Sequence, residues 1–217
     1  MASIRSEART RDVLKAVRPY MSRHRSARHK FQPQHAALLV IDMQRYFLDP
    51  SSHAYLPDSK HIVGNVQSLI SRCRERSIPI LFTRHAHQRA EDTGNMGSWW
   101  GDVIRDGTEM STIDNRFAPL PKEKILRKTR YSAFVGTGLE RWLRARRASQ
   151  LLITGVMTHL CCETTARDAF MKGFDVFFVV DGTASKTQDL HVSSIKTLTD
   201  GFAIPVSTKE VLRWMLE

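Results

Sequence analysis

Short apolar runs alternate with segments of helical periodicity from His35 to the C-terminus, and this order constrains the fold more than any other feature. The runs are apolar throughout instead of alternating in polarity, which is typical of strands buried on both faces. Strands that alternate with helices form a parallel sheet with right-handed crossovers. We therefore expect an α/β fold with helices on both faces of the sheet. The expected strands are Ala36–Asp42, Ile78–Thr83, Lys124–Lys128, Leu151–Gly155, Asp175–Asp181 and Phe202–Val206.

The rest of this region consists of helices and one long excursion. The excursion, His85–Pro121, is rich in glycine, polar and aromatic residues, and such length inside a compact domain usually indicates a functional loop or lid. We place one domain at 35–217, preceded by an extension at 1–34. Apolar residues at helical spacing predict helices from Ile62 to Ser77, at Gly138–Arg147, Glu163–Lys172 and Leu190–Thr199, and from Ser207 onward.

The extension is strongly basic. Residues 1–30 contain nine lysines or arginines and two acids, so they carry about +7 of the formal charge of the chain, which is +11. Such an arm suits nucleic acid or another anionic surface, but no aromatic stacking pattern or nucleic-acid-binding signature accompanies it. We therefore favour a solvated or subunit-packing extension and do not expect nucleic acid as a partner. One face of a helix that ends near Pro19 would carry Ile4, Val13, Leu14, Val17 and Tyr20.

The cysteines and the hydropathy pattern indicate the compartment. Three cysteines, Cys73, Cys161 and Cys162, are few and odd in number, which does not suit a disulfide framework. No apolar stretch approaches the roughly 18 residues of a membrane span, and the N-terminus lacks the apolar core of a signal peptide. We expect a soluble protein of the reducing cytoplasm with no membrane association.

Three reactive side chains converge at one edge of the expected sheet. Asp42 ends the first strand, Lys128 ends the third, and Cys161 follows the fourth near a helix start. Ligands of parallel sheets bind beyond the carboxyl ends of the strands. Together the three residues supply a nucleophile, an acceptor for its proton and a cation, which indicates nucleophilic catalysis on a small molecule. The helix start and the ammonium are expected to lower the pKa of the thiol.

Three stretches resemble the signature blocks of the isochorismatase-like hydrolases, which include nicotinamidase, N-carbamoylsarcosine amidase and isochorismatase. They are AALLVIDMQRYF (36–47), KTRYSAFVGTGLERWLR (128–144) and LLITGVMTHLCCETTARDAFMKGFDVFFVVDGTAS (151–185). The resemblance covers the chain from about His35 to the C-terminus. It implies a single-domain, three-layer α/β/α, Rossmann-like fold with a six-stranded, mostly parallel sheet, assembled as a homodimer or homotetramer.

The same resemblance implies roles for individual residues. Asp42 would act as the base, Lys128 as its electrostatic partner and Cys161 as the nucleophile. A non-proline cis peptide is implied at Val156–Met157, which would aim the amide of Met157, with that of Cys161, at a developing oxyanion. The substrate would be a small amide, ureido or related C–N compound, cleaved through a thioester on the cysteine.

Two alternatives stay open. Isochorismatases that cleave a vinyl ether commonly lack the cysteine and use the aspartate, here Asp42, as an acid without a covalent intermediate. The segments Arg130–Phe134 and Thr154–Val156, the latter followed by His159, look more like isochorismatase than nicotinamidase, although the retained cysteine favours acyl transfer. The other alternative is a non-catalytic interaction protein with a nucleic-acid-binding arm. The intact set of three reactive residues argues against it, because a protein without catalysis has no physical need for all three.

The resemblance also raises the question of a metal site after the second strand. Nicotinamidases place a metal after the second strand, using one aspartate and histidines. Here His87 matches one histidine, but His85 stands at the aspartate position and no second downstream histidine follows at the family spacing. We therefore expect no metal or other cofactor, with His85 and His87 as weak candidate ligands.

The residues expected to line the substrate pocket are Gln44, Phe47, Trp99, Trp100, Tyr131, Phe134 and His159.

Overall fold

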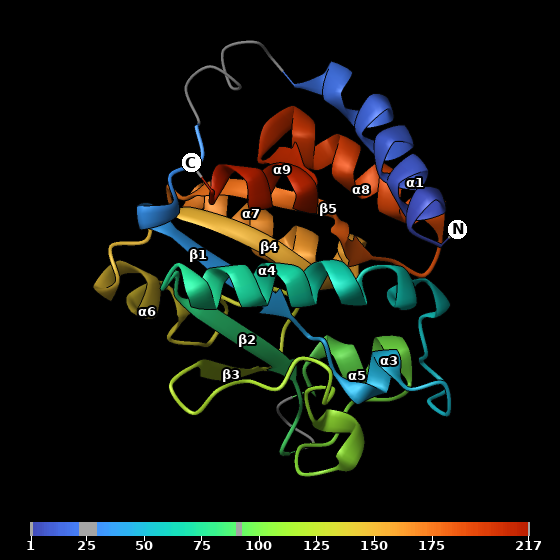
Figure 1. The fold of residues 1–217 in the computed structure, drawn as a ribbon. Coiled ribbons are helices and arrows are strands. Elements are labelled where there is room, and N and C mark those ends of the chain that lie inside the picture. The colour runs from blue at the N-terminus through green and yellow to red at the C-terminus, as the bar shows by residue number, and fades with distance from the viewer. Residues whose placement is uncertain (1, 22–29, 90–92, 217) are drawn as a thin grey trace.

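The fold is built on one parallel sheet. The computed structural model describes residues 2–21, 30–89 and 93–216. Six strands pair in the order β3-β2-β1-β4-β5-β6, all parallel (Figure 1), which confirms the expected fold. Every residue of the central strands β1 and β4 is buried. The strands are β1 (Ala36–Ile41), β2 (Ile80–His85), β3 (Lys124–Lys128), β4 (Gln150–Val156), β5 (Asp175–Ala184) and β6 (Ile204–Val206).

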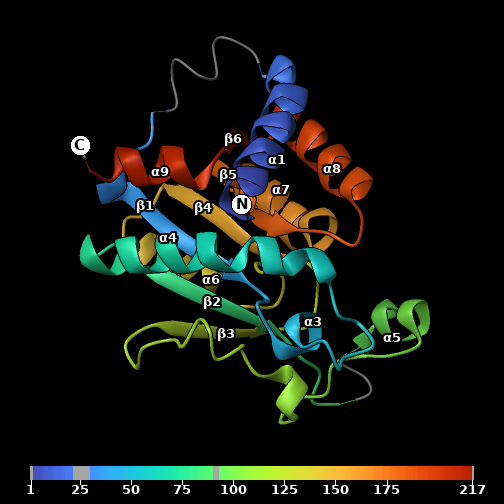
Figure 2. The same ribbon diagram turned by 45° about the vertical axis from the view of Figure 1, so that its right-hand side comes forward.

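Helices cover both faces of the sheet (Figures 1 and 2). Because successive side chains of a strand point to opposite faces, β1 supplies two cores: Leu38 and Val40 face one, and Leu39 and Ile41 the other. None of the described helices is long and apolar enough to cross a membrane. The core that contains Leu38 and Val40 is covered by α3 (Arg45–Leu48), α4 (Val63–Glu75) and α9 (Thr208–Trp214). The core that contains Leu39 and Ile41 is covered by α1 (Ala2–Val17), α6 (Leu139–Ala145), α7 (Glu163–Met171) and α8 (Gln188–Gly201).

The sheet departs from the prediction at the end of β5. This strand continues past the predicted Asp181 to Ala184, because Thr183 and Ala184 pair with β4 again after a shift in register. The partner of Thr183 is Gly155, which has a φ of 114°. A Cβ on this glycine would lie 2.0 Å from the carbonyl oxygen of Ile41. Glycine therefore permits β4 to run close against the end of β1, where the site begins.

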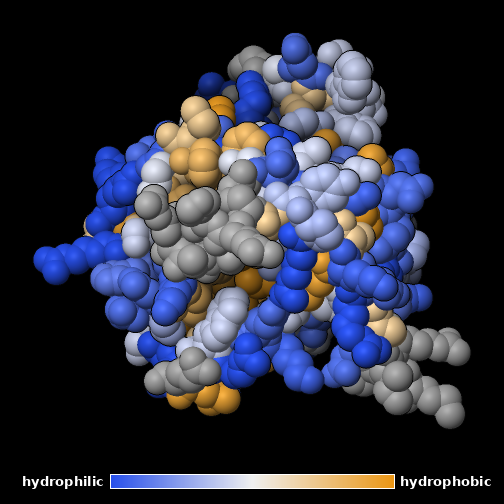
Figure 3. Space-filling model, turned by 90° about the horizontal axis from the view of Figure 1, so that it is seen from above, coloured by the Kyte–Doolittle hydropathy of each residue, from blue (hydrophilic) through white to orange (hydrophobic). Residues whose placement is uncertain are grey.

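The basic extension packs on its own domain. Helix α1 lies beside α8 (Figure 2), and Val13, Leu14 and Val17 join the core as the helical stripe predicted, whereas Tyr20 is 48% exposed. Arg9 forms an ion pair with Asp58 at 2.6 Å, and Arg18 with Glu210 at 2.5 Å. The surface on this side is mainly hydrophilic (Figure 3). Part of the basic run, residues 22–29, lies outside the described chain, and the boundary between 34 and 35 stays a prediction.

Candidate active site

Asp42, Lys128 and Cys161 meet at the carboxyl edge of the sheet, where the order of elements placed them. The Nζ atom of Lys128 lies 2.7 Å from Oδ2 of Asp42 and 3.2 Å from Sγ of Cys161. All three side chains are nearly enclosed, with Asp42 0%, Lys128 1% and Cys161 6% exposed. Water is therefore largely excluded from the group, and its members interact more strongly than they would at the surface.

The backbone and one neighbour fix the Asp42 carboxylate. Asp42 follows β1 with a φ of 48°, a left-handed conformation that Asp tolerates better than most residues, and its carbonyl accepts a 2.7 Å hydrogen bond from the amide of Gln44. The hydroxyl of Thr83, on β2, donates to Oδ1 at 2.6 Å and accepts from the Asp42 amide at 3.1 Å. One carboxylate oxygen is thus held by Thr83, and the other faces the ammonium.

Lys128 is a buried cation with more acceptors than protons. Besides Asp42 and Cys161, Nζ lies 3.1 Å from the carbonyl oxygen of Arg130 and 3.3 Å from Nδ1 of His85. An ammonium has three protons, so the weakly accepting thiol competes with three better partners. Burial works against the charge, but the interactions with Asp42 and Cys161 outweigh it and raise the pKa of Lys128 above its usual value. The side chain therefore stays an ammonium at neutral pH.

The thiol of Cys161 behaves differently from the sequence-based expectation. Cys161 belongs to a wide π-type helical turn, η6 (Thr158–Cys162), directly before α7. We expected a lowered pKa, but burial raises the pKa of Cys161 to about 12, with Asp42 adding to the rise and Lys128 opposing it. The expectation was wrong because loss of water costs a thiolate more than the ammonium returns. The resting site therefore holds a neutral thiol beside an ion pair, and the thiol needs a base.

The peptide bond Val156–Met157 is cis, as the resemblance implied. It lies between β4 and η6, in the segment that leads to Cys161. The assignment of the Met157 and Cys161 amides to an oxyanion hole stays a prediction.

A cavity of about 450 Å³ opens onto Cys161, a volume typical of small-molecule sites. Four of the predicted pocket residues, Phe47, Trp100, Tyr131 and His159, line it. The indole nitrogen of Trp100 donates to the Tyr131 hydroxyl at 2.7 Å, which ties α5 (Asn95–Trp100), in the long excursion, to the segment after β3. His159 bonds through Nδ1 to the hydroxyl of Ser185, and burial lowers its pKa, so it is neutral.

The other three predicted pocket residues lie outside the lining. Gln44 is buried behind the site, where it accepts a hydrogen bond from the His85 amide at 2.7 Å and donates to carbonyls of His85 and Ser111. Phe134 packs in the core, with its ring 6.0 Å from that of Phe174. Trp99 is 79% exposed and is not among the residues that line the cavity. These placements correct the expectation that all seven residues form the pocket walls.

Several lining residues escaped the sequence reasoning. The excursion contributes Met96, Val103 and Ile104, and no periodic signal marks them. Tyr46 and Tyr55 lie in the segment after β1. Because ligands bind beyond the carboxyl ends of parallel strands, a search of the residues that follow each strand could have found them. The same argument would have found Lys186, two residues after the end of β5.

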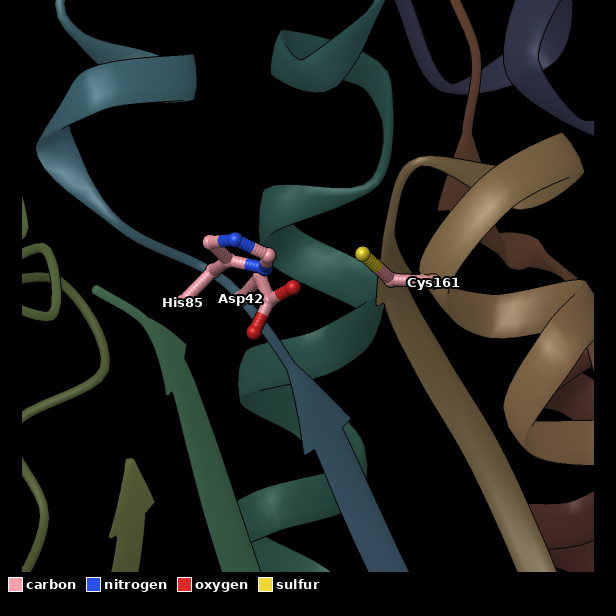
Figure 4. A group of neighbouring side chains, drawn as sticks. All are labelled: Asp42, His85 and Cys161. Carbon is pink, nitrogen blue, oxygen red and sulfur yellow. The ribbon is translucent and has the colours of Figure 1, made fainter. Parts of the chain in front are cut away.

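His85, the last residue of β2, and His87 belong to the hydrogen-bond network of Lys128. Ligand atoms of Asp42, His85 and Cys161 lie within 4.8 Å of one another, and Figure 4 shows the sulfur pointing toward the other two. However, Lys128 already places its ammonium within 3.3 Å of all three residues. His85 bonds to His87 through Nε2 at 2.9 Å, and burial lowers the pKa of His85 to about 3. The set therefore fits the protein's own cation and does not fit a metal ion.

Several known proteins are similar to this chain in sequence and in fold. The Isochorismatase domain model matches residues 36–210. The chain is 42% identical over 204 residues to Nicotinamidase 3 of Arabidopsis thaliana, covering 93% of this chain and 97% of that protein. It is 32% identical over 181 residues to the Isochorismatase of Bacillus subtilis (strain 168), covering 83% of this chain and 58% of that protein. The crystal structure of a cysteine hydrolase from Pseudomonas syringae pv. phaseolicola 1448A matches with a TM-score of 0.84 at 26% identity, over 87% of this chain and 96% of that chain.

Proposed function

Since this chain belongs to the isochorismatase family and is a hydrolase, we propose that it is a cysteine hydrolase that cleaves a small amide, ureido or related C–N substrate. The observation that carries the proposal is the thiol of Cys161 at the wall of the cavity, 3.2 Å from the ammonium of Lys128 and beside Asp42. Family membership makes the chain an enzyme and removes the alternative of a non-catalytic interaction protein. We further propose that it works in the cytoplasm, as a homodimer or homotetramer and without a required cofactor.

The proposed reaction begins with the neutral thiol. Asp42 takes the proton of Cys161, and Lys128 turns toward the sulfur as it becomes an anion. The thiolate attacks the substrate carbonyl, and the amides of Met157 and Cys161 hold the oxyanion that forms. Asp42 returns the proton to the departing amine, which leaves an acyl thioester. Water deprotonated by Asp42 then attacks the thioester and releases the carboxylic acid and the free thiol.

A second candidate is hydrolysis of a vinyl ether. It is supported by the Isochorismatase among the relatives and by His159, which follows an isochorismatase-like segment and lines the cavity. In that reaction Asp42 would donate a proton and Cys161 would have no covalent role. The 42% identity to a protein named nicotinamidase favours the amide reaction.

A panel of small amides, ureas and isochorismate tests the proposal. We expect ammonia or amine release from at least one amide or ureido compound, together with a mass increase of one acyl group on Cys161 in acid-quenched samples. Turnover of isochorismate alone, without any adduct on the cysteine, would replace the proposal by the second candidate.

The raised pKa of the thiol predicts a steep pH dependence of its chemical modification. Below a pKa of about 12 the thiolate fraction grows about tenfold per pH unit, so alkylation of Cys161 by iodoacetamide should accelerate about tenfold per unit between pH 7 and pH 9. Peptide mass spectrometry measures the rate, and the buried Cys73 and Cys162, which do not line the cavity, serve as internal controls. A rate that is flat over this range would mean that Cys161 is already a thiolate at rest.

A further inference from the structure

Lys186 is a charged side chain of the cavity that the proposed reaction does not use. It lies between β5 and α8, at the same edge of the sheet as Cys161, and it lines the cavity while remaining exposed. No described residue forms an ion pair or hydrogen bond with it at the distances expected for such contacts. Burial lowers the pKa of His159, Glu163 opposes this effect, and the charge of Lys186 adds a smaller lowering. Lys186 and His159 therefore lie close enough to interact, and both line the cavity.

The described lining also contains one carboxylate, that of Asp102. Asp102 accepts a hydrogen bond from the hydroxyl of Tyr46 at 2.8 Å and lies 3.1 Å from Nε2 of His53. At the base of the site, Asp42 and Lys128 neutralise each other. Lys186 is thus the ammonium in the described lining that lacks a carboxylate partner.

Most of the remaining lining is apolar. Phe47, Leu56, Ile104, Met157 and Leu160 present aromatic or aliphatic side chains to the cavity. Such a surface favours a substrate with an apolar body, because burying polar groups there would leave them without hydrogen-bond partners. The cavity therefore combines largely apolar walls with an ammonium that has no ion-pair partner among the described residues.

We propose that Lys186 binds an anionic group of the substrate, so that the enzyme prefers amides with an apolar body and a carboxylate over neutral amides of the same skeleton. The inference rests on the proposed function for the reacting bond, which lies at Cys161. The charge recognition is a separate property of the cavity, because it depends on Lys186 and not on the chemistry at the sulfur. Lys186 thereby acts as a specificity residue.

A pair of alkylating agents tests the charge recognition without any substrate. Iodoacetate carries the carboxylate that iodoacetamide lacks, and both react with Cys161. We expect Lys186→Gln to lower the ratio of the iodoacetate to the iodoacetamide rate about fivefold, the upper end for a solvent-exposed charge pair, and Lys186→Glu to lower it further. Lys209→Gln, an exposed position on α9, is the matched control and should leave the ratio unchanged. A ratio that is the same in Lys186→Gln and wild type would overturn the proposal.

The specificity itself is measured with pairs of amides that differ only by a carboxylate. We expect Lys186→Gln to raise KM about fivefold for the acidic member and to leave kcat, and the neutral member, nearly unchanged. An equal effect on both members contradicts the assignment. If wild type cleaves no amide at all, the proposed function fails, whereas the alkylation ratio still decides whether Lys186 attracts anions to the cavity.

Discussion

Replacing Cys161 with alanine is expected to abolish the covalent intermediate and to lower kcat/KM for an amide by about 10⁴-fold or more. The reason lies in the resting geometry: the thiol is the nucleophile on the cavity wall, and Asp42 and Lys128 are placed to serve it. Without sulfur, Asp42 could still activate water, but no thioester can form. Mass spectrometry of quenched samples and steady-state kinetics measure the two losses.

The neighbouring cysteine provides the matched control. Cys162 is fully buried, its sulfur lies 4.0 Å from the carbonyl oxygen of Thr154, and it does not line the cavity. Cys162→Ala should therefore keep the acyl adduct and most of the activity while losing some stability through the cavity that it creates. Full turnover of an amide by Cys161→Ala would refute the covalent scheme. Turnover of isochorismate by that variant, with all amides inert, would support the vinyl-ether reaction.

The sheet and the three reactive residues were predictable because both depend on short-range patterns. A continuous apolar run such as Leu38–Ile41 specifies a doubly buried strand, and the carboxyl ends of parallel strands share one edge. Asp42, Lys128 and Cys161 therefore had to approach one another once the strand order was known. The end of β5 was harder, because its extension depends on pairing with Gly155 across a register shift.

The pocket walls were less predictable because they depend on how the long excursion folds back. Tyr131 and Phe134 follow the same strand, yet one faces the cavity and the other the core. Gln44 lies beside the reactive aspartate in sequence but holds the backbone of His85 instead of lining the cavity. The pKa of Cys161 was missed for a related reason: helix position and a nearby cation can be read from the sequence, whereas the extent of burial is a property of the folded chain.

Substituting Lys128 with methionine is expected to destabilise the protein by about 3–5 kcal/mol, because it leaves the carboxylate of Asp42 buried without its cation. For a chain of this size the loss corresponds to a fall in Tm of roughly 10 °C. Unfolding in urea, followed by circular dichroism at neutral pH, measures it. The surface pair Arg72–Glu75, in which Arg72 is partly buried, is the control, and Arg72→Met should cost about 0–1 kcal/mol.

The double substitution Lys128→Met with Asp42→Leu separates charge from packing. If the cost of Lys128→Met comes from an uncompensated carboxylate, removing that carboxylate as well should recover much of the lost stability, since apolar side chains of similar volume often replace a buried ion pair without loss. If the cost comes from lost packing, the double variant should be less stable than either single variant. A Lys128→Met protein as stable as the Arg72→Met control would show that Asp42 does not depend on Lys128 for its charge, and the proposed resting state of a neutral thiol beside an ion pair would then be wrong.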